Sequence, residues 1–435
     1  MTVVSQLVSA ASVPSTSAEI SRIRALTLAN LAAACGLRGD ANAVLKSACF
    51  NSDSPGDRAY RMGVLLHART QDDFFPRGRC HPGAVSLAAA LGLGGAVEGR
   101  LLESLAIGYR VTCLVSEAYA SSAQQRGLRP TGVFGALGGA AMAARAIGLD
   151  QQGIASAIAL AAAHSGGTNQ AWISGSQEWL TQVGVASRLA VESALMVKAG
   201  VESAPDALEG ASGFSAALFG DEDAGSLRAS LGSDQSADLI AAVAVKPYPI
   251  SGIAQVPTDL AIDLHRQLSA GKDDSNISAI VVRMNPAEAS YPGTDNQEPV
   301  RTRAAALMSI RHCVACGLLD GKIGLDRLEH PEMSDLNRLS GMVEVQADPR
   351  LEETEAVLEV STGNRTLESH GHGSKLLYPS WDDLDSDIAG LASRSEASEK
   401  VVQELRSKLA AGVPDVMQLR LTIEEEVIWP CRSNR

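Results

Sequence analysis

The chain has 435 residues, of which 45% are hydrophobic and 4% aromatic, and it carries a formal net charge of −13. This acidic balance argues against binding to nucleic acid or to an anionic membrane surface, and the few aromatic residues leave little to stack on bases. The length exceeds what one hydrophobic core usually supports, so two domains are the first expectation.

No targeting or membrane segment is apparent in the sequence. The N-terminal stretch MTVVSQLVSAASVPSTSAEI has no basic region followed by a sustained apolar run, and no later segment offers about 18 uninterrupted apolar residues. Seven cysteines at irregular spacings favour reduced thiols over a disulfide framework. We therefore expect a soluble, cytoplasmic protein without a membrane partner.

Helical periodicity, interrupted by glycine and proline, runs from about residue 18 to residue 245 and predicts one large all-α domain. Within it, the densest polar cluster before a helix contains Asp72, Asp73 and His81, and Pro82 then opens an apolar helix. A histidine at a helix start with carboxylates nearby is typical of a general acid or base. The alternative is an ordinary capped loop.

A second helix start follows at Pro130, and Arg129 stands directly before it. A helix N-terminus is partly positive, so a cation there is unfavourable unless an anion joins it. Arg129 is therefore predicted to bind a carboxylate or phosphate of a ligand, with a solvated surface arginine as the alternative. Lys246, in the proline-containing loop KPYPISGIAQ, is a further candidate for binding an anion, although most lysines face water.

The pattern changes after about residue 270. Residues 276–286, 341–350 and 355–365 are short, β-branched and alternating, which predicts strands, with a hairpin turn at Gly363-Asn364. A helical stretch at 301–323 makes this part an α+β domain, and 397–409 is helical again. We expect a mainly α protein with a helical domain at 1–262 and 395–435 and a smaller α+β lid domain at 263–394.

Metal and cofactor signals are weak. Cys313 and Cys316 form a C-x-x-C on a helical pattern without a second pair, and His370 and His372 lie two apart in a predicted loop. Phosphate-loop, dinucleotide and nucleophile-elbow motifs are absent from the sequence. The sequence thus predicts neither a metal nor a cofactor.

Several motifs, in this order and spacing, resemble the MmgE/PrpD family: HPGAVSLAAALGL, GYRV, RPTGVFGALGGAAMAARAIGLD, ALEGASGFSAALFG, KPYP and ACGLLDG. The resemblance covers most of the chain. It implies a large helical domain, an α+β lid domain and a homodimer. It also implies cofactor-independent proton transfer on small di- or tricarboxylic acids, with loss of water or carbon dioxide in some members.

Residue by residue, His81 matches the histidine of the family's HP motif, and Asp72 and Asp73 match its paired acids. Four positions depart from the pattern: Arg129 and Gln255 replace histidines, Glu178 falls where a lysine is common, and His312 lies where a tyrosine is frequent. We expect His81 and His312 to be catalytic. The residues expected to bind substrate are Arg129, Lys246, Asp72, Asp73, Gln255 and Glu178.

Three functions are compatible with this pattern. The leading one is a lyase (dehydratase or decarboxylase), or an epimerase or other isomerase, acting on a small carboxylic acid that differs from the family's usual substrates, in secondary metabolism. A second is an enzyme that steers cyclisation or rearrangement of a natural-product intermediate, with Arg129 and Gln255 as hydrogen-bond donors. The third is a non-catalytic ligand-binding homologue.

Overall fold

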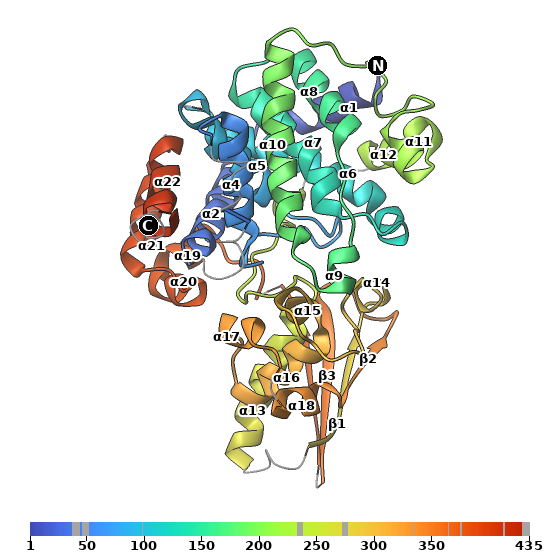
Figure 1. The fold of residues 1–435 in the computed structure, drawn as a ribbon, viewed down its shortest axis with the longest axis vertical. Coiled ribbons are helices and arrows are strands. Elements are labelled where there is room, and N and C mark those ends of the chain that lie inside the picture. The colour runs from blue at the N-terminus through green and yellow to red at the C-terminus, as the bar shows by residue number, and fades with distance from the viewer. Residues whose placement is uncertain are drawn as a thin grey trace. The chain divides into compact units, whose positions relative to one another are not determined.

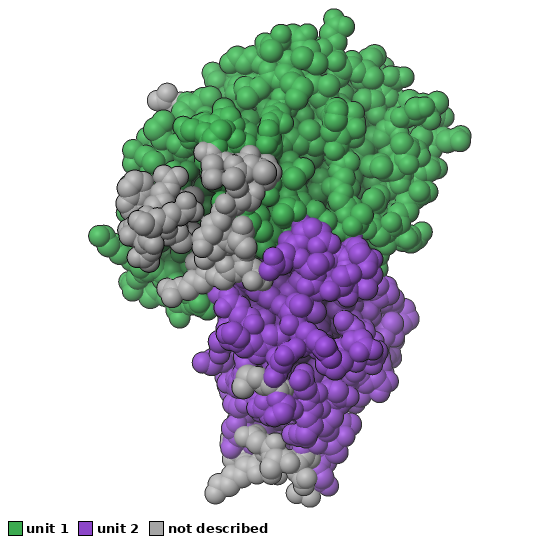
Figure 2. All heavy atoms as spheres, in the orientation of Figure 1, with its two compact units in different colours: residues 1–168, 180–245, 379–435 green, residues 169–179, 246–378 purple. Residues whose placement is uncertain are grey.

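The computed structural model describes residues 1–36, 44–45, 52–97, 99–232, 238–271, 277–332, 334–363, 365–374, 376–411 and 414–428. The chain forms two compact units (Figure 2). Unit 1 comprises Met1–Thr168, Leu180–Val245 and Pro379–Arg435, and unit 2 comprises Asn169–Trp179 and Lys246–Tyr378. Among the helices described, none combines the length and the apolar character needed to cross a membrane.

Unit 1 is built of helices (Figure 1). Side-chain caps start several of them: Thr16 and Glu19 form a reciprocal capping box, and Asp150 accepts the N–H of Gly153. The main helices are α1 (Val3–Ala11), α2 (Ser17–Cys35), α4 (Pro55–His67), α5 (Pro82–Leu93), α6 (Leu101–Gln125), α7 (Pro130–Ala146), α8 (Gln151–His164), most of α10 (Glu178–Lys198), α11 (Phe214–Phe219), α12 (Gly225–Leu231), α19 (Trp381–Ser386), α20 (Ile388–Ser395), α21 (Glu399–Ala410) and α22 (Val416–Ile423).

The core of unit 1 lies around α5 and α7, whose residues are almost all buried, and α6, most of whose residues are buried. Glycine allows α6 and α7 to approach closely, because a Cβ on Gly138 would lie 1.8 Å from the Thr112 hydroxyl oxygen and 2.4 Å from the Gly108 carbonyl oxygen. The helical periodicity and the close helix packing expected from the glycine-rich sequence are both present.

Unit 2 contains a four-stranded sheet in the order β2-β1-β3-β4. Its strands are β1 (Ile277–Met284), β2 (Val343–Ala347), β3 (Glu355–Thr362) and β4 (Thr366–His372); β1 and β2 are parallel, and the other pairs are antiparallel. The helices are α9 (Gln170–Ser174), α13 (Gln255–Gly271), α14 (Pro286–Ala289), α15 (Arg303–Met308), α16 (Ile310–Asp320), α17 (Leu325–Glu329) and α18 (Ser334–Ser340). Helix α13 packs on β3 and β4, and α16 packs on α13 and β2.

The expected fold class, mainly α with a smaller α+β domain, is confirmed. All three expected strands are present. The expectation of a loop around His370 and His372 is wrong, because this segment is strand β4. Its exposed residues alternate with half-buried ones rather than with a buried apolar face, so the pattern of a strand is missing; the exposed residues are Thr366, Glu368, His370 and His372. Asn364 of the predicted hairpin turn lies outside the described residues.

The units divide at 245/246 and 378/379, whereas the sequence suggested 262/263 and 394/395. Helix α13 belongs with the sheet because it packs on β3, β4 and α16. Helices α19 and α20 belong with the helical unit because they pack on α2. A short segment, 169–179, which the sequence placed in the helical domain, also belongs to unit 2.

Candidate active site

The loop between α4 and α5, residues 68–81, carries the polar cluster that the sequence singled out. Its backbone is strained, since Thr70 and Arg79 have φ of 54° and 49°, a region that a β-branched threonine rarely adopts. The loop is held at its start by Arg69, which is fully buried and donates to the carbonyl oxygens of Gly36 (2.9 Å) and Arg394 (3.4 Å). Strain in a tightly held loop is typical of a functional site.

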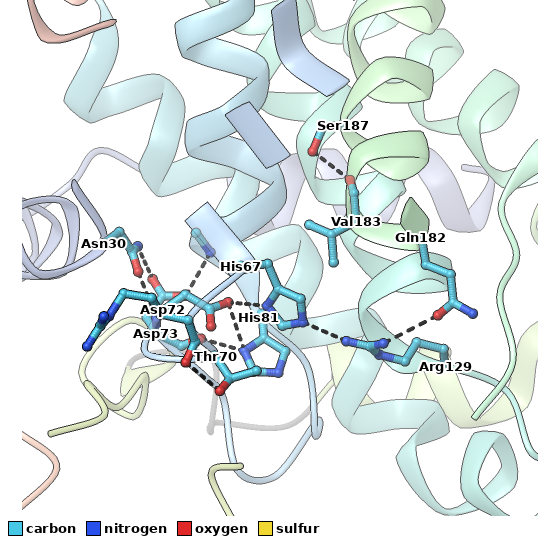
Figure 3. A network of polar contacts seen from close by, with 12 residues as sticks. Asn30, His67, Thr70, Asp72, Asp73, His81, Arg129, Gln182, Val183 and Ser187 are labelled. Atoms are coloured by element: carbon cyan, nitrogen blue, oxygen red, sulfur yellow. Dashed lines mark hydrogen bonds and ion pairs between the residues drawn. The ribbon is translucent and has the colours of Figure 1, made fainter. Parts of the chain in front are cut away.

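Three titratable side chains meet at this loop (Figure 3). His67, the last residue of α4, places Nδ1 2.8 Å from Asp72 Oδ2, and His81, the N-cap of α5, places Nδ1 3.1 Å from the same oxygen. The two imidazole rings lie edge to face, with centroids 4.7 Å apart. His67 and Asp72 are enclosed, whereas the His81 side chain is 17% exposed.

The partners of His67 fix the position of its proton. Arg129 Nη2 lies 2.7 Å from His67 Nε2, and a guanidinium nitrogen only donates, so Nε2 accepts. Nδ1 then carries the proton and donates it to Asp72. Burial, the largest influence, lowers the pKa of His67 to about 3 against the opposing effect of Asp72, and His81 and Arg129 lower it further. His67 is therefore neutral at neutral pH.

The proton of His81 is fixed in the same way. Its Nδ1 lies 2.8 Å from the Asp73 carbonyl oxygen and 3.1 Å from Asp72 Oδ2, and both of these atoms are acceptors. Nδ1 is therefore protonated, which puts the lone pair of the neutral ring on Nε2. A partly exposed histidine whose other nitrogen is bound to a carboxylate has the arrangement of a general base.

Asp73 fastens the loop to three helices. Its carboxylate accepts from Asn30 Nδ2 (3.0 Å), from the Gly83 N–H (2.9 Å) and from the Tyr109 hydroxyl. Burial raises the pKa of Asp73 to about 6, while the hydrogen bonds from Tyr109 and Asn30 oppose this shift. A Cβ at position 83 would lie 2.3 Å from atoms of Asp73, Asn30 and Tyr109, so the close approach requires glycine. These contacts indicate that Asp73 has a structural role: it anchors the loop to α2, α5 and α6.

Arg129 is the N-cap of α7, as the sequence predicted, but its side chain is only 2% exposed, so the alternative of a solvated surface arginine is wrong. Its Nη1 donates to Gln182 Oε1 at 3.4 Å, and Gln182 Nε2 donates to the Thr168 carbonyl oxygen at 3.0 Å. The guanidinium thus lies between Gln182 and His67 (Figure 3).

The other predicted site residues lie in unit 2. Lys246 is buried, and Glu178 is the exposed first residue of α10. Gln255 begins α13, where its amide Nε2 donates to the carbonyl oxygens of Tyr248 (3.0 Å) and Ile250 (3.1 Å) and its Oε1 accepts from the Tyr248 N–H (3.1 Å). These hydrogen bonds hold the turn at 248–251, so Gln255 has a structural role there. Lys246, Glu178 and Gln255 are therefore not part of the cluster that His67, Asp72 and His81 form in unit 1.

His312 lies in α16 of unit 2, where it is fully buried. Its Nε2 donates to the Arg327 carbonyl oxygen at 3.2 Å, and burial lowers its pKa to about 4. The sequence paired His312 with His81 in catalysis. Since the two residues belong to different units, this pairing stays a prediction.

His67, Asp72 and His81 also have the composition of a metal site, with the three nearest ligand atoms within 4.8 Å of one another. The donor pattern does not fit a metal held through those atoms. A metal on His67 Nδ1 would move the proton to Nε2, where it would face the N–H of Arg129. A metal on His81 Nδ1 would remove the N–H that the Asp73 carbonyl oxygen accepts.

Sequence reasoning missed His67, Gln182, Asn30 and Tyr109. The one local signal is that His67 ends an apolar helix five residues before Asp72, a position from which a helix C-terminus and the following loop can bring the two together. Asn30 and Tyr109 come from α2 and α6, and Gln182 comes from α10, so no spacing along the chain reveals them.

Comparison with models of known protein families agrees with this description. Residues 14–226 match the MmgE/PrpD N-terminal domain, and residues 248–373 match the MmgE/PrpD C-terminal domain. The chain belongs to the MmgE/PrpD family. Members of this family are typically lyases or dehydratases, which supports an enzyme with dehydratase-type activity on small carboxylic acids. A search of curated proteins finds no match.

Proposed function

We propose that the protein is a cofactor-independent lyase, either a dehydratase or a decarboxylase, or an isomerase, which acts on a small carboxylic acid by proton transfer at His81. The observation that carries the proposal is the His67–Asp72–His81 cluster, in which the partners of each ring define where its proton lies.

In this mechanism His81 Nε2 takes a proton from the carbon next to a carboxylate or carbonyl of the substrate. The C–H electron pair moves into the adjacent carboxylate or carbonyl as an enolate-like system, and His81 becomes an imidazolium. Asp72 stabilises that cation through the Nδ1–H contact, as a carboxylate does for the histidine of a catalytic triad.

The three reaction types differ in the step that follows or precedes this transfer. In dehydration, the enolate electron pair expels a β-hydroxyl group, which leaves as water after receiving a proton. In decarboxylation, His81 starts the cycle as the imidazolium. The bond between the carbon and its carboxylate breaks, the electron pair stays on the carbon as carbon dioxide leaves, and His81 Nε2–H gives that carbon a proton, which the solvent then replaces. In epimerisation, the proton returns to the opposite face. The sequence suggests His312 as the group for the second proton transfer, but the hydrogen bond of its ring to a backbone carbonyl does not favour that role, so the proposal does not depend on it.

The family supports a carboxylic acid as the substrate. Within the cluster, the permanent cation Arg129, 2.7 Å from His67, and the anion Asp72, which both histidines share, balance each other. Lys246, Gln255 and Glu178 are proposed contacts from unit 2. A homodimer, a cytoplasmic location and a role in secondary metabolism are further parts of the proposal, supported by the family resemblance and the composition.

The test is proton NMR in D₂O with citrate, methylcitrate, aconitate and substituted succinates, in excess metal chelator. The purified protein is expected to give new vinyl signals or exchange of the proton next to a carboxylate. His81→Ala is expected to abolish this signal, and His164→Ala, which changes an exposed histidine of the same unit, is the matched control. Silence from the wild-type protein across the panel, or full activity of His81→Ala, would contradict the proposal.

A further inference from the structure

Arg129 was predicted to bind a carboxylate of the ligand, but the structure gives its guanidinium two partners inside the protein. The side chain is 2% exposed, with Nη2 on His67 Nε2 and Nη1 on Gln182 Oε1. Gln182 is itself oriented, because its Nε2 donates to the Thr168 carbonyl oxygen and its Oε1 therefore faces the guanidinium. Arg129 thus belongs to a chain of contacts that leads from Gln182 through His67 and Asp72 to His81.

We propose that Arg129 is a positioning residue, which fixes the protonation state of His67 and, through His67, the charge of the Asp72 carboxylate that faces His81, rather than binding the substrate. The inference rests on the proposed function only in taking His81 as the base. The direction of donation is Arg129 to His67 to Asp72, with His81 donating to Asp72 from the other side.

The argument compares the states that His67 can adopt. With the proton on Nε2, an N–H of His67 would face an N–H of Arg129 at 2.7 Å, and the Nδ1 lone pair would face the Asp72 carboxylate at 2.8 Å, so both contacts would be repulsive. A doubly protonated His67 would put a second cation against Arg129 in an enclosed site. Only the neutral Nδ1–H tautomer makes both contacts favourable.

The protonation state of His67 then influences the charge of the Asp72 carboxylate. Asp72 Oδ2 accepts from His67 Nδ1 and from His81 Nδ1, and two donors on one oxygen favour the ionised carboxylate. An ionised Asp72 joins the Asp73 carbonyl oxygen in holding the His81 proton on Nδ1, which leaves the lone pair on Nε2, and it supplies the anion that stabilises the His81 imidazolium. A histidine at position 129 would not fix this direction, because a neutral imidazole can donate or accept. The arginine therefore defines a single protonation pattern.

The experiment is nitrogen-15 NMR of histidine-labelled protein, which distinguishes the two neutral tautomers and the imidazolium. His67→Gln and His81→Gln assign the two signals among the eight histidines. We expect the Nδ1–H tautomer for both residues in the wild-type protein. In Arg129→Met, Asp72 still accepts from Nδ1 but the neighbouring cation is gone, so His67 is expected to gain an imidazolium fraction. Arg145→Met, which changes an exposed arginine of the same helix, should leave both signals unchanged.

Arg129→Lys is the second variant, because lysine keeps a cationic donor and is expected to restore the wild-type tautomers at least in part. An Nε2–H signal for His67 in the wild-type protein, or an unchanged protonation state of His67 in a folded Arg129→Met, would overturn the inference. Kinetics gives an independent outcome: a positioning role predicts that kcat falls more than KM rises, and a large rise of KM alone would restore Arg129 as the substrate anchor. The NMR result does not require turnover. It can therefore contradict the role of Arg129 independently of whether the proposed enzymatic function is correct.

Discussion

His67 in unit 1 and His312 in unit 2 are both enclosed histidines whose pKa burial lowers, to about 3 and about 4. They differ in their partners. His67 has hydrogen bonds at both ring nitrogens. His312 has one at Nε2, and its Nδ1 has no hydrogen-bond partner in the described part of the chain.

The difference favours unit 1 as the environment for the proton transfer that we propose. In unit 1, an arginine that only donates, a carboxylate that accepts from both rings and the Asp73 carbonyl oxygen place one proton on Nδ1 of each ring, so neutral His81 holds its lone pair on Nε2. In unit 2, a single backbone carbonyl fixes the ring of His312. Each of the following predictions tests or sharpens this contrast.

The largest effect is expected from Asp72→Asn. The amide keeps the shape of the side chain but replaces an anion that accepts from both histidines. His81 therefore loses the carboxylate that stabilises its imidazolium, although the Asp73 carbonyl oxygen still accepts from its Nδ1. By analogy with catalytic triads, turnover should fall by up to about 10⁴-fold. Steady-state kinetics with the preferred acid measures this, and activity within a few-fold of wild type would show that Asp72 does not orient the base.

Asp73→Ala is expected to act on stability. It leaves the Tyr109 hydroxyl, Asn30 Nδ2 and the Gly83 N–H without their acceptor in a buried site, which should cost about 2–4 kcal/mol of the free energy of unfolding. Urea denaturation measures the loss. Asp150→Ala is the control, because it removes one exposed N-cap contact and should cost about 1 kcal/mol. Equal losses in the two variants would contradict the anchoring role of Asp73.

Acid should destabilise the protein through His67. Its pKa is lowered from 6.5 to about 3 on folding, so between these values the unfolded chain binds a proton that the folded protein does not. Stability is therefore unaffected by His67 above about pH 6.5 and falls as the pH decreases below it. Asp73, with its pKa raised to about 6, acts in the opposite direction between about pH 6 and its ordinary value of 3.8.

His67→Gln isolates the histidine contribution, because the Asp73 contribution is common to both proteins. The loss of unfolding free energy from pH 7 to pH 5 should be about 2 kcal/mol smaller in the variant than in the wild type. Denaturation curves at the two pH values test this, with His164→Gln as the exposed control. An identical pH dependence in all three proteins would mean that His67 is not held neutral.

The smallest effect is expected from His312→Gln. A glutamine amide can still donate to the Arg327 carbonyl oxygen, and no second hydrogen bond of the histidine ring, within the described residues, is lost. Turnover should therefore change by less than about tenfold. A loss as deep as that of Asp72→Asn would make His312 the second proton-transfer group that the sequence suggests.

Much of the fold is predictable because its signals are local. Helical periodicity gives the elements of unit 1, and β-branched alternation gives β1, β2 and β3. Strand β4 is not predictable from the sequence, because its exposed residues are polar and its half-buried positions include Ser369 and Gly371. It pairs at the sheet edge without an apolar pattern. The boundaries between the units are not predictable from the local sequence, because α13 belongs with the sheet only through its tertiary packing.

The site is predictable only in part. His81 and Asp72 are separated by a short loop and belong to one sequence motif, so the sequence reveals both. Gln182 reaches Arg129 from α10, 53 residues further along the chain, and Asn30 reaches Asp73 from 43 residues before it. The burial of Arg129 depends on those distant elements, and hence its role at a helix start cannot be deduced from the local sequence.

The most direct test of the account is the rate at which deuterium from D₂O enters the preferred carboxylic acid next to its carboxylate, measured for Asp72→Asn and His312→Gln side by side. The account predicts that incorporation is almost lost in Asp72→Asn and largely retained in His312→Gln. Retention in Asp72→Asn together with loss in His312→Gln would contradict it and would place the proton-transfer group in unit 2.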